Sequence, residues 1–547
     1  MSASREKKQR LSSGEALTQK ELKERKEAEA AKRKTITYWI VGIVVVILVA
    51  ALLIWDSGLI QRNMTAATIG GENLSVAEMQ YYYNSARQSE IQEQQMYSQY
   101  GISILSDPYV MYDSSSALGD EQVYNTESGQ TYADHFKESA LNNARRVIAL
   151  NQAAKAEGYT LSADGKASVD ESIASLKEGV KSSNWSSLGA YLSAAYGSYV
   201  SESLYVKQVT ASTLANEYAT HHQDSLTYDD AALNDYAAEN PANVYSYDYR
   251  VAYVDGSVPT TDAEGNTVEV TDDQKAAALG AAKTKADVLA EGVKKASDKS
   301  GAFDELVTSA VGEDSTYASA DNNLKTAVLG SALSQDYTAN AYYDWLTSAD
   351  RKAGDVEVIE STSGYYVVLL TDRYLNDAAT VDVRHILAKA ELTPADEEAG
   401  TPAATEPTQE QMDAAKARAQ EALDRYLAGE QTAEAFGALA NELSDDTGSN
   451  TKGGLYTYVE EGSMVKGFND WIFDPARQSG DTGLVEQNEA GGNYFGWHVV
   501  YFQGVNGPKW HEVAESALKS ADMTAWLEGL DEACAITESG SMSLALK

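Results

Sequence analysis

The sequence predicts an α+β protein of several domains: one N-terminal transmembrane helix, a helical region, and two tandem domains in which an antiparallel sheet is flanked by helices. Three observations predict this. They are an uncharged apolar run near the amino end, a long stretch with helical patterning and capping signals, and an internal repeat of strand and helix patterns. The length of 547 residues suits roughly three or four domains.

The apolar run covers residues 36–55, reads ITYWIVGIVVVILVAALLIW, and contains no charged residue. At a helical rise of about 1.5 Å per residue, about 20 residues span the hydrocarbon core of a bilayer. Tyr38, Trp39 and Trp55 stand where interfacial aromatic residues are found. The alternative is a cleaved signal peptide, whose apolar region is shorter, about 7–15 residues. We predict an uncleaved anchor over 35–56.

Charge is divided unevenly on the two sides of this run. Residues 1–34 hold eleven Lys and Arg against six Glu, a net +5, whereas the whole chain carries −39 and the rest therefore −44. Because basic segments stay on the cytoplasmic side, the tail 1–34 is predicted to be cytoplasmic and the bulk extracytoplasmic, in a single-pass protein of the cell membrane. The lipid bilayer is then a partner through one helix. The strong negative charge argues against nucleic acid as a partner.

Residues 57–240 have a helical, polar pattern. The segment AATIGGENLSVAEMQYYYNSAR predicts a short strand, a Gly-Gly turn, and a helix capped at Ser75 with Glu78 three residues on. A further helix is expected to end at Gly158. The carboxyl-terminal segment 509–547 reads as an amphipathic helix followed by a strand. Because so short a helix is unstable alone, it is expected to complete the 57–240 region.

An internal repeat sets the architecture of the remaining chain. Three pairs of segments match: 343–355 with 469–481, 363–370 with 495–502, and 247–254 with 381–388. Each copy reads strand, long helix, short helix, turn, helix, strand. We therefore predict two domains of one fold, over 241–376 and 377–508.

The second copy carries an ordered set of chemically distinctive residues. They are two strand histidines, a loop aspartate and four large apolar or aromatic residues: His385, His498, Asp446, Tyr458, Met464, Phe468 and Phe473. Taken singly, a strand histidine is more often a core residue than a catalytic one. Met464 and Phe468, four residues apart, would also suit an ordinary core.

Together, the order His, Asp, Gly-Gly, Met, Phe, Gly-x-His resembles the parvulin family of peptidyl-prolyl isomerases over the whole second copy. The wider chain resembles the membrane-attached extracytoplasmic foldases of the PrsA and SurA type, which implies a chaperone-like helical domain over 57–240. The resemblance implies that His385, Asp446 and His498 form the catalytic set. It also implies a substrate-binding surface that holds the proline ring, formed by Tyr458, Met464, Phe468 and Phe473. No metal, cofactor or covalent intermediate is expected.

The first copy lacks these residues. Val251 stands where the second copy has His385, Tyr366 where it has His498, Glu313 near Asp446, and Thr347 in place of Phe473. A parvulin-like fold without isomerase activity, with a role in binding or spacing, is therefore predicted for 241–376.

A proline-rich acidic loop at 391–410 separates the first strand and helix of the second copy. It contains Pro394, Pro402, Pro407, Asp396, Glu397, Glu398 and Glu406. Phosphate-specific relatives carry basic residues in this connection, so an acidic loop favours substrates with unmodified X-Pro bonds. The alternative is a surface insertion without a role in selectivity.

The sequence thus predicts a foldase that binds unfolded exported polypeptides and isomerises their X-Pro bonds. Two alternatives use the same features differently: a chaperone or holdase with little isomerase activity, and an envelope scaffold or adhesin that reuses the fold. The remaining histidines, His221 and His222 among them, show no convincing ligand spacing, and Cys534 is the one cysteine.

Overall fold

The computed structural model describes residues 5, 19–56, 58–101, 103, 105–261, 265–395, 402–488 and 494–546. The chain divides into two compact units. One comprises Met1–Leu226 with Asp522–Lys547, and the other comprises Thr227–Ala521.

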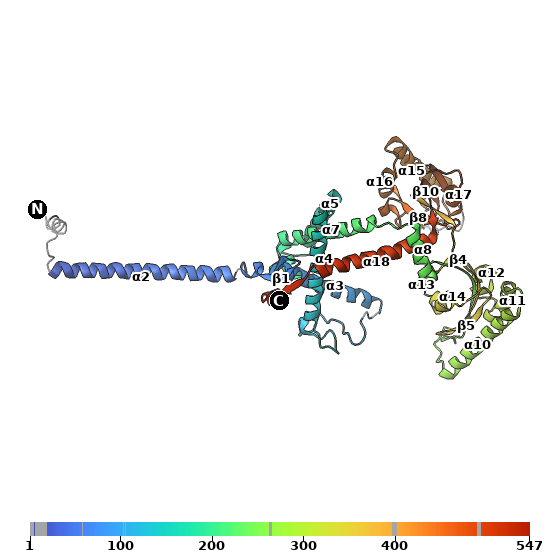
Figure 1. Cartoon of the computed structure of the whole chain (residues 1–547), viewed down its shortest axis with the longest axis horizontal. Coiled ribbons are helices and arrows are strands. Elements are labelled where there is room, and N and C mark those ends of the chain that lie inside the picture. Colours follow the sequence, from blue (N-terminus) through green and yellow to red (C-terminus); the bar gives the residue numbers. More distant parts are fainter. Residues whose placement is uncertain are drawn as a thin grey trace. The chain divides into compact units, whose positions relative to one another are not determined.

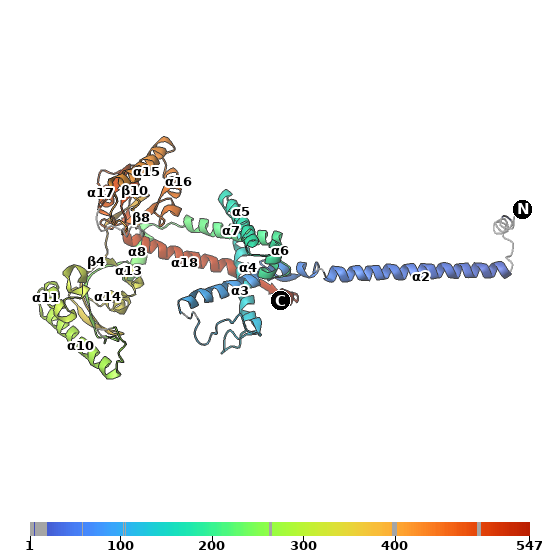
Figure 2. The same cartoon turned by 180° about the vertical axis from the view of Figure 1, so that it is seen from behind.

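The amino end of the first unit is one long helix, α2 (Gln19–Asp56), which runs without a break in Figures 1 and 2. Its apolar side chains are exposed, for example Trp39 at 70% and Leu52 at 67%. Within the described residues this is the one helix long and apolar enough to cross a membrane.

The rest of the first unit is helical around a small sheet. Its elements are β1 (Thr65–Ile69), β2 (Glu72–Ser75), α3 (Val76–Gln99), α4 (Tyr132–Glu157), α5 (Ala163–Ser182), α6 (Leu188–Tyr196) and α7 (Glu202–Ser225). The capping box expected at Ser75 and Glu78 is present, and Gly158 ends α4 in a left-handed conformation with φ 75°. Both expected helix boundaries are confirmed.

The carboxyl end of the chain lies in the same core as β1. Strand β11 (Ile536–Glu538) pairs antiparallel with β1, and Figure 1 places the C-terminus beside it. Cys534 and Met542, the latter in α19 (Met542–Ala545), are buried against β1, α3 and α4. Arg146 of α4 donates two hydrogen bonds to Asp531, at 2.6 and 3.1 Å. Residues about 400 positions apart thus share one hydrophobic core.

The second unit contains two sheets of identical topology. The first has the order β4-β3-β6-β5, from β3 (Ser246–Asp255), β4 (Leu324–Leu329), β5 (Val356–Ser361) and β6 (Gly364–Tyr374). The second has the order β8-β7-β10-β9, from β7 (Ala379–Lys389), β8 (Leu455–Val459), β9 (Thr482–Gln487) and β10 (Gly496–Pro508). All of these pairs are antiparallel. The α+β class and the two antiparallel sheets of one topology are confirmed.

Helices cover both sheets in the same way. In the first domain, α10 (Asp272–Lys295) and α11 (Lys299–Val311) pack on one face, while α13 (Gly330–Gln335) and α14 (Tyr343–Thr347) pack on the other. In the second, α15 (Gln409–Ala428) and α16 (Ala433–Leu443) cover one face, and α17 (Lys466–Ile472) lies against the other. The short helix α12 (Ala320–Asn323) precedes β4.

Three further helices connect these domains to the rest of the unit. Helix α8 (Asp230–Glu239) and α9 (Pro241–Val244) share a small core with the start of α18 (Lys509–Ala533). Trp510, 3% exposed, is the large side chain in this core. Helix α18 belongs to the second unit up to Ala521 and to the first from Asp522.

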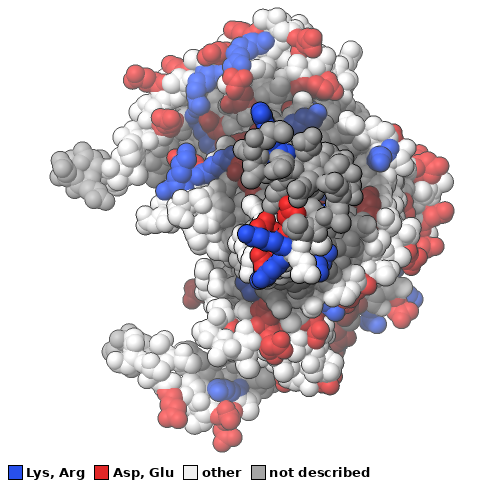
Figure 3. All heavy atoms as spheres, turned by 90° about the vertical axis from the view of Figure 1, so that its left-hand side faces the viewer, with Lys and Arg blue, Asp and Glu red and all other residues white. Residues whose placement is uncertain are grey.

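On the face that Figure 3 shows, the acidic side chains are not concentrated at one place. In Figure 3, Asp and Glu side chains are scattered across the visible face rather than gathered into a single patch. A distributed negative charge favours solubility and self-repulsion over a defined cation site.

Gly454 is a position where the fold of the second sheet excludes any side chain. Its φ is +67°, and a Cβ there would lie 2.1 Å from the carbonyl oxygen of His385, whose N–H donates to Gly454 at 2.9 Å. We expect Gly454→Ala to destabilise this domain by about 3 kcal/mol or more, because the clash with backbone adds to left-handed strain. Hydrogen exchange of the β7 amides measures the effect.

The matched control is Gly462→Ala. Gly462 has φ +89° but nothing within 4 Å of its Cβ position, so only the backbone strain of about 1–2 kcal/mol remains. Equal effects of the two substitutions would contradict the close packing at Gly454.

Candidate active site

Two neighbouring strands bring the paired histidines together. In the antiparallel register of β7 and β10, His385 lies opposite Val500 and His498 opposite Leu387. Because alternate residues of a strand share a face, both imidazoles project from the same face of the sheet. Their Nδ1 atoms are 3.1 Å apart, and the residues are only 5% and 2% exposed. The two rings therefore form one buried, hydrogen-bonded pair.

Asp446, in the loop after α16, hydrogen-bonds to this pair. Ser444 anchors the loop, since its Oγ accepts hydrogen bonds from the backbone N–H of Leu387 at 3.0 Å and of Asp446 at 3.2 Å. The Oδ2 atom of Asp446 then lies 2.9 Å from Nε2 of His385. Three residues distant in sequence thus form a continuous polar chain.

The pKa values of Asp446 and His498 shift in a way that fits this geometry. The hydrogen bond from His385 lowers the pKa of Asp446 well below its usual range, with further lowering from Ser449 and the backbone of Gly448 and an opposing effect of burial. Burial, together with the neighbouring His385, lowers the pKa of His498 to about 3. At neutral pH the site therefore holds an ionised carboxylate and a neutral His498.

An apolar wall borders the polar chain. Phe468 of α17 packs edge-on against both imidazoles, with ring centroids 5.6 Å from His385 and 5.0 Å from His498. Met464, in the segment before α17, and Phe473, which caps its C-terminus, are partly buried in the same cluster. Met464 thus lies outside the helix, so the regular i, i+4 core pattern is not the reason for its position. The arrangement can hold a small apolar ring beside a fixed hydrogen-bond network.

The structure does not bring Tyr458 to this cluster. Its backbone N–H donates to Asp382 at 2.9 Å, and its side chain hydrogen-bonds Glu515, which together with burial raises its pKa. The reason is an irregularity in β8, where Val381 pairs with Val459 but Val383 pairs with Tyr456, and Tyr458 adopts φ 51°. Strand alternation is therefore broken between the two tyrosines.

Tyr456, rather than Tyr458, lies beside the histidines. Its hydroxyl donates to Oδ2 of Asp446 at 3.0 Å, and its ring lies 5.1 Å from that of His385. The sequence order alone did not single it out, because a regular strand would put residues 456 and 458 on the same face.

Two further members of the network were also missed. Ser449 Oγ lies 3.2 Å from Nε2 of His385 and donates to Asp446, and Tyr494 OH lies 3.2 Å from Nε2 of His498. Their spacing from the predicted residues, three after Asp446 and four before His498, was the only signal in the sequence.

Part of the acidic loop, residues 396–401, lies outside the described residues, including Asp396, Glu397 and Glu398. Beside its described ends is a pocket of about 320 Å³ lined by Lys389, Glu391 and Arg418 among others. Arg418 is 3.0 Å from Asp445, so one of the two cations is already paired. The surroundings of the loop are thus of mixed charge.

The first domain has a different constellation at the equivalent positions. Val251 lies opposite Val368 in the β3–β6 register, as His385 lies opposite Val500. Tyr366 packs against Tyr253 and Tyr342, with ring centroids 4.8 and 5.3 Å apart. Glu313 is exposed, and Thr347 bonds to the backbone of its own helix. An aromatic cluster thus replaces the polar chain.

The other histidines named in the sequence pack against aromatic rings. His221 lies 4.9 Å from Tyr159, and His222 stacks on Trp526 at 3.8 Å. Within the part of the chain that the structure describes, no group of three or more His, Cys, Asp or Glu side chains is placed to hold a metal ion.

A pH dependence follows from the buried His498. Its pKa is near 6.5 unfolded and lower in the folded domain, so between these values the unfolded state binds more protons. We expect stability to be full above about pH 6.5 and to fall as pH falls, with a slope approaching about 1.4 kcal/mol per pH unit. Urea unfolding of the domain at pH 4–7 measures it. His498→Asn should flatten the slope, and an unchanged slope in that variant would contradict the assignment.

Comparison with known proteins identifies this part of the chain. Residues 375–505 match the model of the PPIC-type PPIase domain family. Among solved structures, the chain is similar to a peptidylprolyl isomerase, PrsA, from Bacillus cereus, at 17% identity and a TM-score of 0.17, covering 51% of this chain and 90% of that one. A second structure comes from work describing PEB4 and Cj1289 of Campylobacter jejuni as SurA-like chaperones, at 12% identity and a TM-score of 0.15, covering 45% and 74%.

No curated protein matches the chain significantly. The two structural likenesses are too low in TM-score to carry an argument, so the assignment is based on the family match and the topology of the sheet. The family match covers the strands that carry both histidines, the Asp446 loop and α17. The expectation of a parvulin-type isomerase is thereby confirmed, and the chain is a peptidyl-prolyl cis-trans isomerase whose parvulin-type domain comprises residues 375–505.

Proposed function

We propose that the protein is a membrane-anchored extracytoplasmic foldase, which binds unfolded exported polypeptides and isomerises their X-Pro bonds. The observation that carries the proposal is the polar chain of His385, His498 and Asp446 beside the apolar side chains of Met464, Phe468 and Phe473.

The chemistry follows from what rotation of an X-Pro bond requires. The barrier is roughly 20 kcal/mol, because the planar amide loses its resonance when it twists. A site complementary to the twisted amide lowers that barrier without covalent chemistry. Met464, Phe468 and Phe473 hold the proline ring and exclude water. His385, His498 and Asp446 form the catalytic set and orient the amide.

Unmodified X-Pro is the proposed substrate class. A phosphate next to the proline would approach Lys389 and Arg418, but also Glu391. The sequence of the connecting loop 391–410 is acidic as well. Because Arg418 already pairs with Asp445, little free positive charge remains for a dianion. Client segments without a phosphate would not face this charge repulsion.

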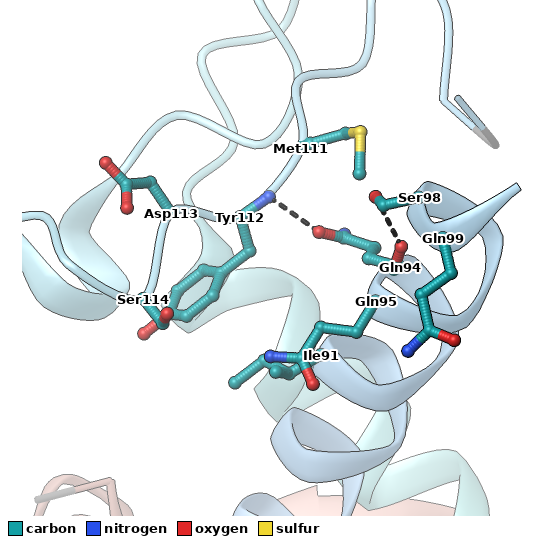
Figure 4. Close-up of a pocket in the computed structure, with 9 residues that line it drawn as sticks. All are labelled: Ile91, Gln94, Gln95, Ser98, Gln99, Met111, Tyr112, Asp113 and Ser114. Atoms are coloured by element: carbon teal, nitrogen blue, oxygen red, sulfur yellow. Dashed lines mark hydrogen bonds between the residues drawn. The ribbon is translucent and has the colours of Figure 1, made fainter. Parts of the chain in front are cut away.

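The helical unit is the proposed holding surface for clients. Between α3 and the following segment lies a pocket of about 480 Å³, shown in Figure 4. Gln95 and Gln99 offer side-chain amides to it, and Ile91 and Met111 offer apolar atoms. This combination suits a polypeptide, which presents amides and apolar side chains together. We propose that this pocket and the first parvulin-like domain bind client segments.

Helix α2 is the proposed anchor. Its exposed apolar segment, the basic residues before it and the acidic chain after it support a single pass with the amino end in the cytoplasm. The first parvulin-like domain, without the histidine pair, is proposed to be catalytically silent.

The second candidate is a holdase in which isomerisation matters little for clients. The aromatic cluster around Tyr366 and the pocket on α3 favour it, since both offer binding without catalysis. Measuring isomerisation and client holding separately in one chain distinguishes the two candidate functions.

Substitutions in the proposed site test the catalytic assignment. In the full chain, His498→Ala and Met464→Ala should each lower kcat/KM for proline-limited refolding at least about tenfold, because one removes a network member and the other a ring contact. Suppression of client aggregation should persist. The matched control is Tyr366→Ala, at the position equivalent to His498, which should leave kcat unchanged. Equal losses in both domains would contradict a silent first copy.

Membrane topology is tested by labelling in intact cells. Lys20→Cys at the start of α2 should resist a membrane-impermeant maleimide, whereas Tyr337→Cys, at a side chain 93% exposed, should react. The native Cys534 is buried, so the unmodified chain gives the background. Labelling of residue 20 with protection of residue 337 would reverse the topology, and labelling of both would exclude a cytoplasmic amino end.

A further inference from the structure

The Tyr494 hydroxyl is the partner of the last ring nitrogen in the polar chain at the isomerase site. Nε2 of His498 is the last ring nitrogen of the chain and lies 3.2 Å from the Tyr494 hydroxyl. Tyr494 stands just before β10, is half-buried, and its ring centroid is 5.8 Å from that of His498. The family pattern in the sequence does not include this residue.

The direction of the first hydrogen bond in the chain follows from Asp446. Its two carboxylate oxygens accept hydrogen bonds from the hydroxyls of Ser449 and Tyr456 and from the backbone N–H of Gly448. A carboxyl group whose oxygens accept hydrogen bonds from this many donors is ionised, because a protonated oxygen would itself be a donor. His385 therefore carries its hydrogen on Nε2 and donates it to Asp446.

The contact between the two histidines holds one hydrogen. Their Nδ1 atoms are 3.1 Å apart, so one nitrogen donates and the other accepts. His498 is neutral at neutral pH and carries a single ring hydrogen. That hydrogen is on Nδ1 when Nε2, the atom that faces Tyr494, accepts a hydrogen bond.

We propose that Tyr494 is a positioning residue for isomerisation: its hydroxyl donates to Nε2 of His498 and sets the direction of the whole chain from Tyr494 through His498 and His385 to Asp446. Phenol is a better donor than acceptor, because its oxygen lone pairs delocalise into the ring, whereas an imidazole lone pair is a good acceptor. Tyr456 donates from the opposite side, so two tyrosines close the chain at its ends. This proposal rests on the proposed roles of His385, His498 and Asp446.

The consequence is a site that holds its histidines without using them as proton donors. His498 is neutral, and each ring nitrogen of the pair has a partner within the network. A buried acceptor without its donor is costly, so loss of the Tyr494 hydroxyl frees His498 to exchange its tautomer or rotate. The rings would then no longer be held in one orientation beneath the amide.

Nitrogen NMR tests the direction of the chain independently of activity. In the full chain labelled with ¹⁵N-histidine, protonated and bare ring nitrogens give separate signals, and His498→Gln assigns those of residue 498. We expect His498 to be protonated at Nδ1 only in the wild type and to show mixed tautomers in Tyr494→Phe. A wild-type His498 protonated at Nε2 would overturn the proposal, even if Tyr494→Phe did not fold. An unchanged spectrum in a folded Tyr494→Phe would also overturn it.

Kinetics test the functional part. Tyr494→Phe should lower kcat about fivefold, the loss expected for one buried hydrogen bond, and leave KM within about twofold, because the ring-holding side chains are intact. The matched control is Tyr501→Phe on the opposite face of the sheet, which should change neither constant. An unchanged kcat in Tyr494→Phe would overturn the positioning role. Absence of isomerase activity in the wild type would instead count against the proposed function, and the NMR result would stand separately.

Discussion

The isomerase site depends on the antiparallel pairing of β7 with β10. This register sets His385 and His498 on one face at hydrogen-bonding distance, and the other components are arranged around them. A shift of one residue would turn one histidine to the opposite face, against α15 and α16, and separate the pair. Gly454 is tied to the same strand through its bond with His385, which explains why a side chain cannot be accommodated there.

Much of this arrangement could be predicted from the sequence, and the limits are physical. The repeat predicted two sheets of one topology because hydrophobic alternation and turn residues are local signals. The histidines and Asp446 were predictable from the residue order that resembles the parvulin family, because a strand histidine taken singly would suit an ordinary core. Tyr456 was not, since the irregularity in β8 that exchanges it with Tyr458 depends on pairing with β7. Ser449 and Tyr494 are ordinary loop residues whose contacts form only in the folded chain.

The two domains place different side chains on one fold. Both keep the strand order and the helices that cover the sheet, so the buried apolar residues are enough for folding. Where the second domain has imidazoles and a carboxylate, the first has Val251 and a cluster of tyrosines. Buried polar groups must be paired to be tolerated. At the positions equivalent to His385 and His498, the first domain accordingly has neither histidine rather than one without its partner.

The network also explains how a half-buried carboxylate is compatible with the proposed apolar proline site. Asp446 would be costly beside Phe468 if it were unpaired, but its charge is spread over donors from His385, Ser449, Tyr456 and Gly448. The histidine pair extends this network toward the apolar wall, where His498 is neutral. In the proposed site, a twisted amide next to Phe468 would meet fixed dipoles rather than a bare charge. Such preorganised dipoles favour the twisted amide without proton transfer, which is what bond rotation requires.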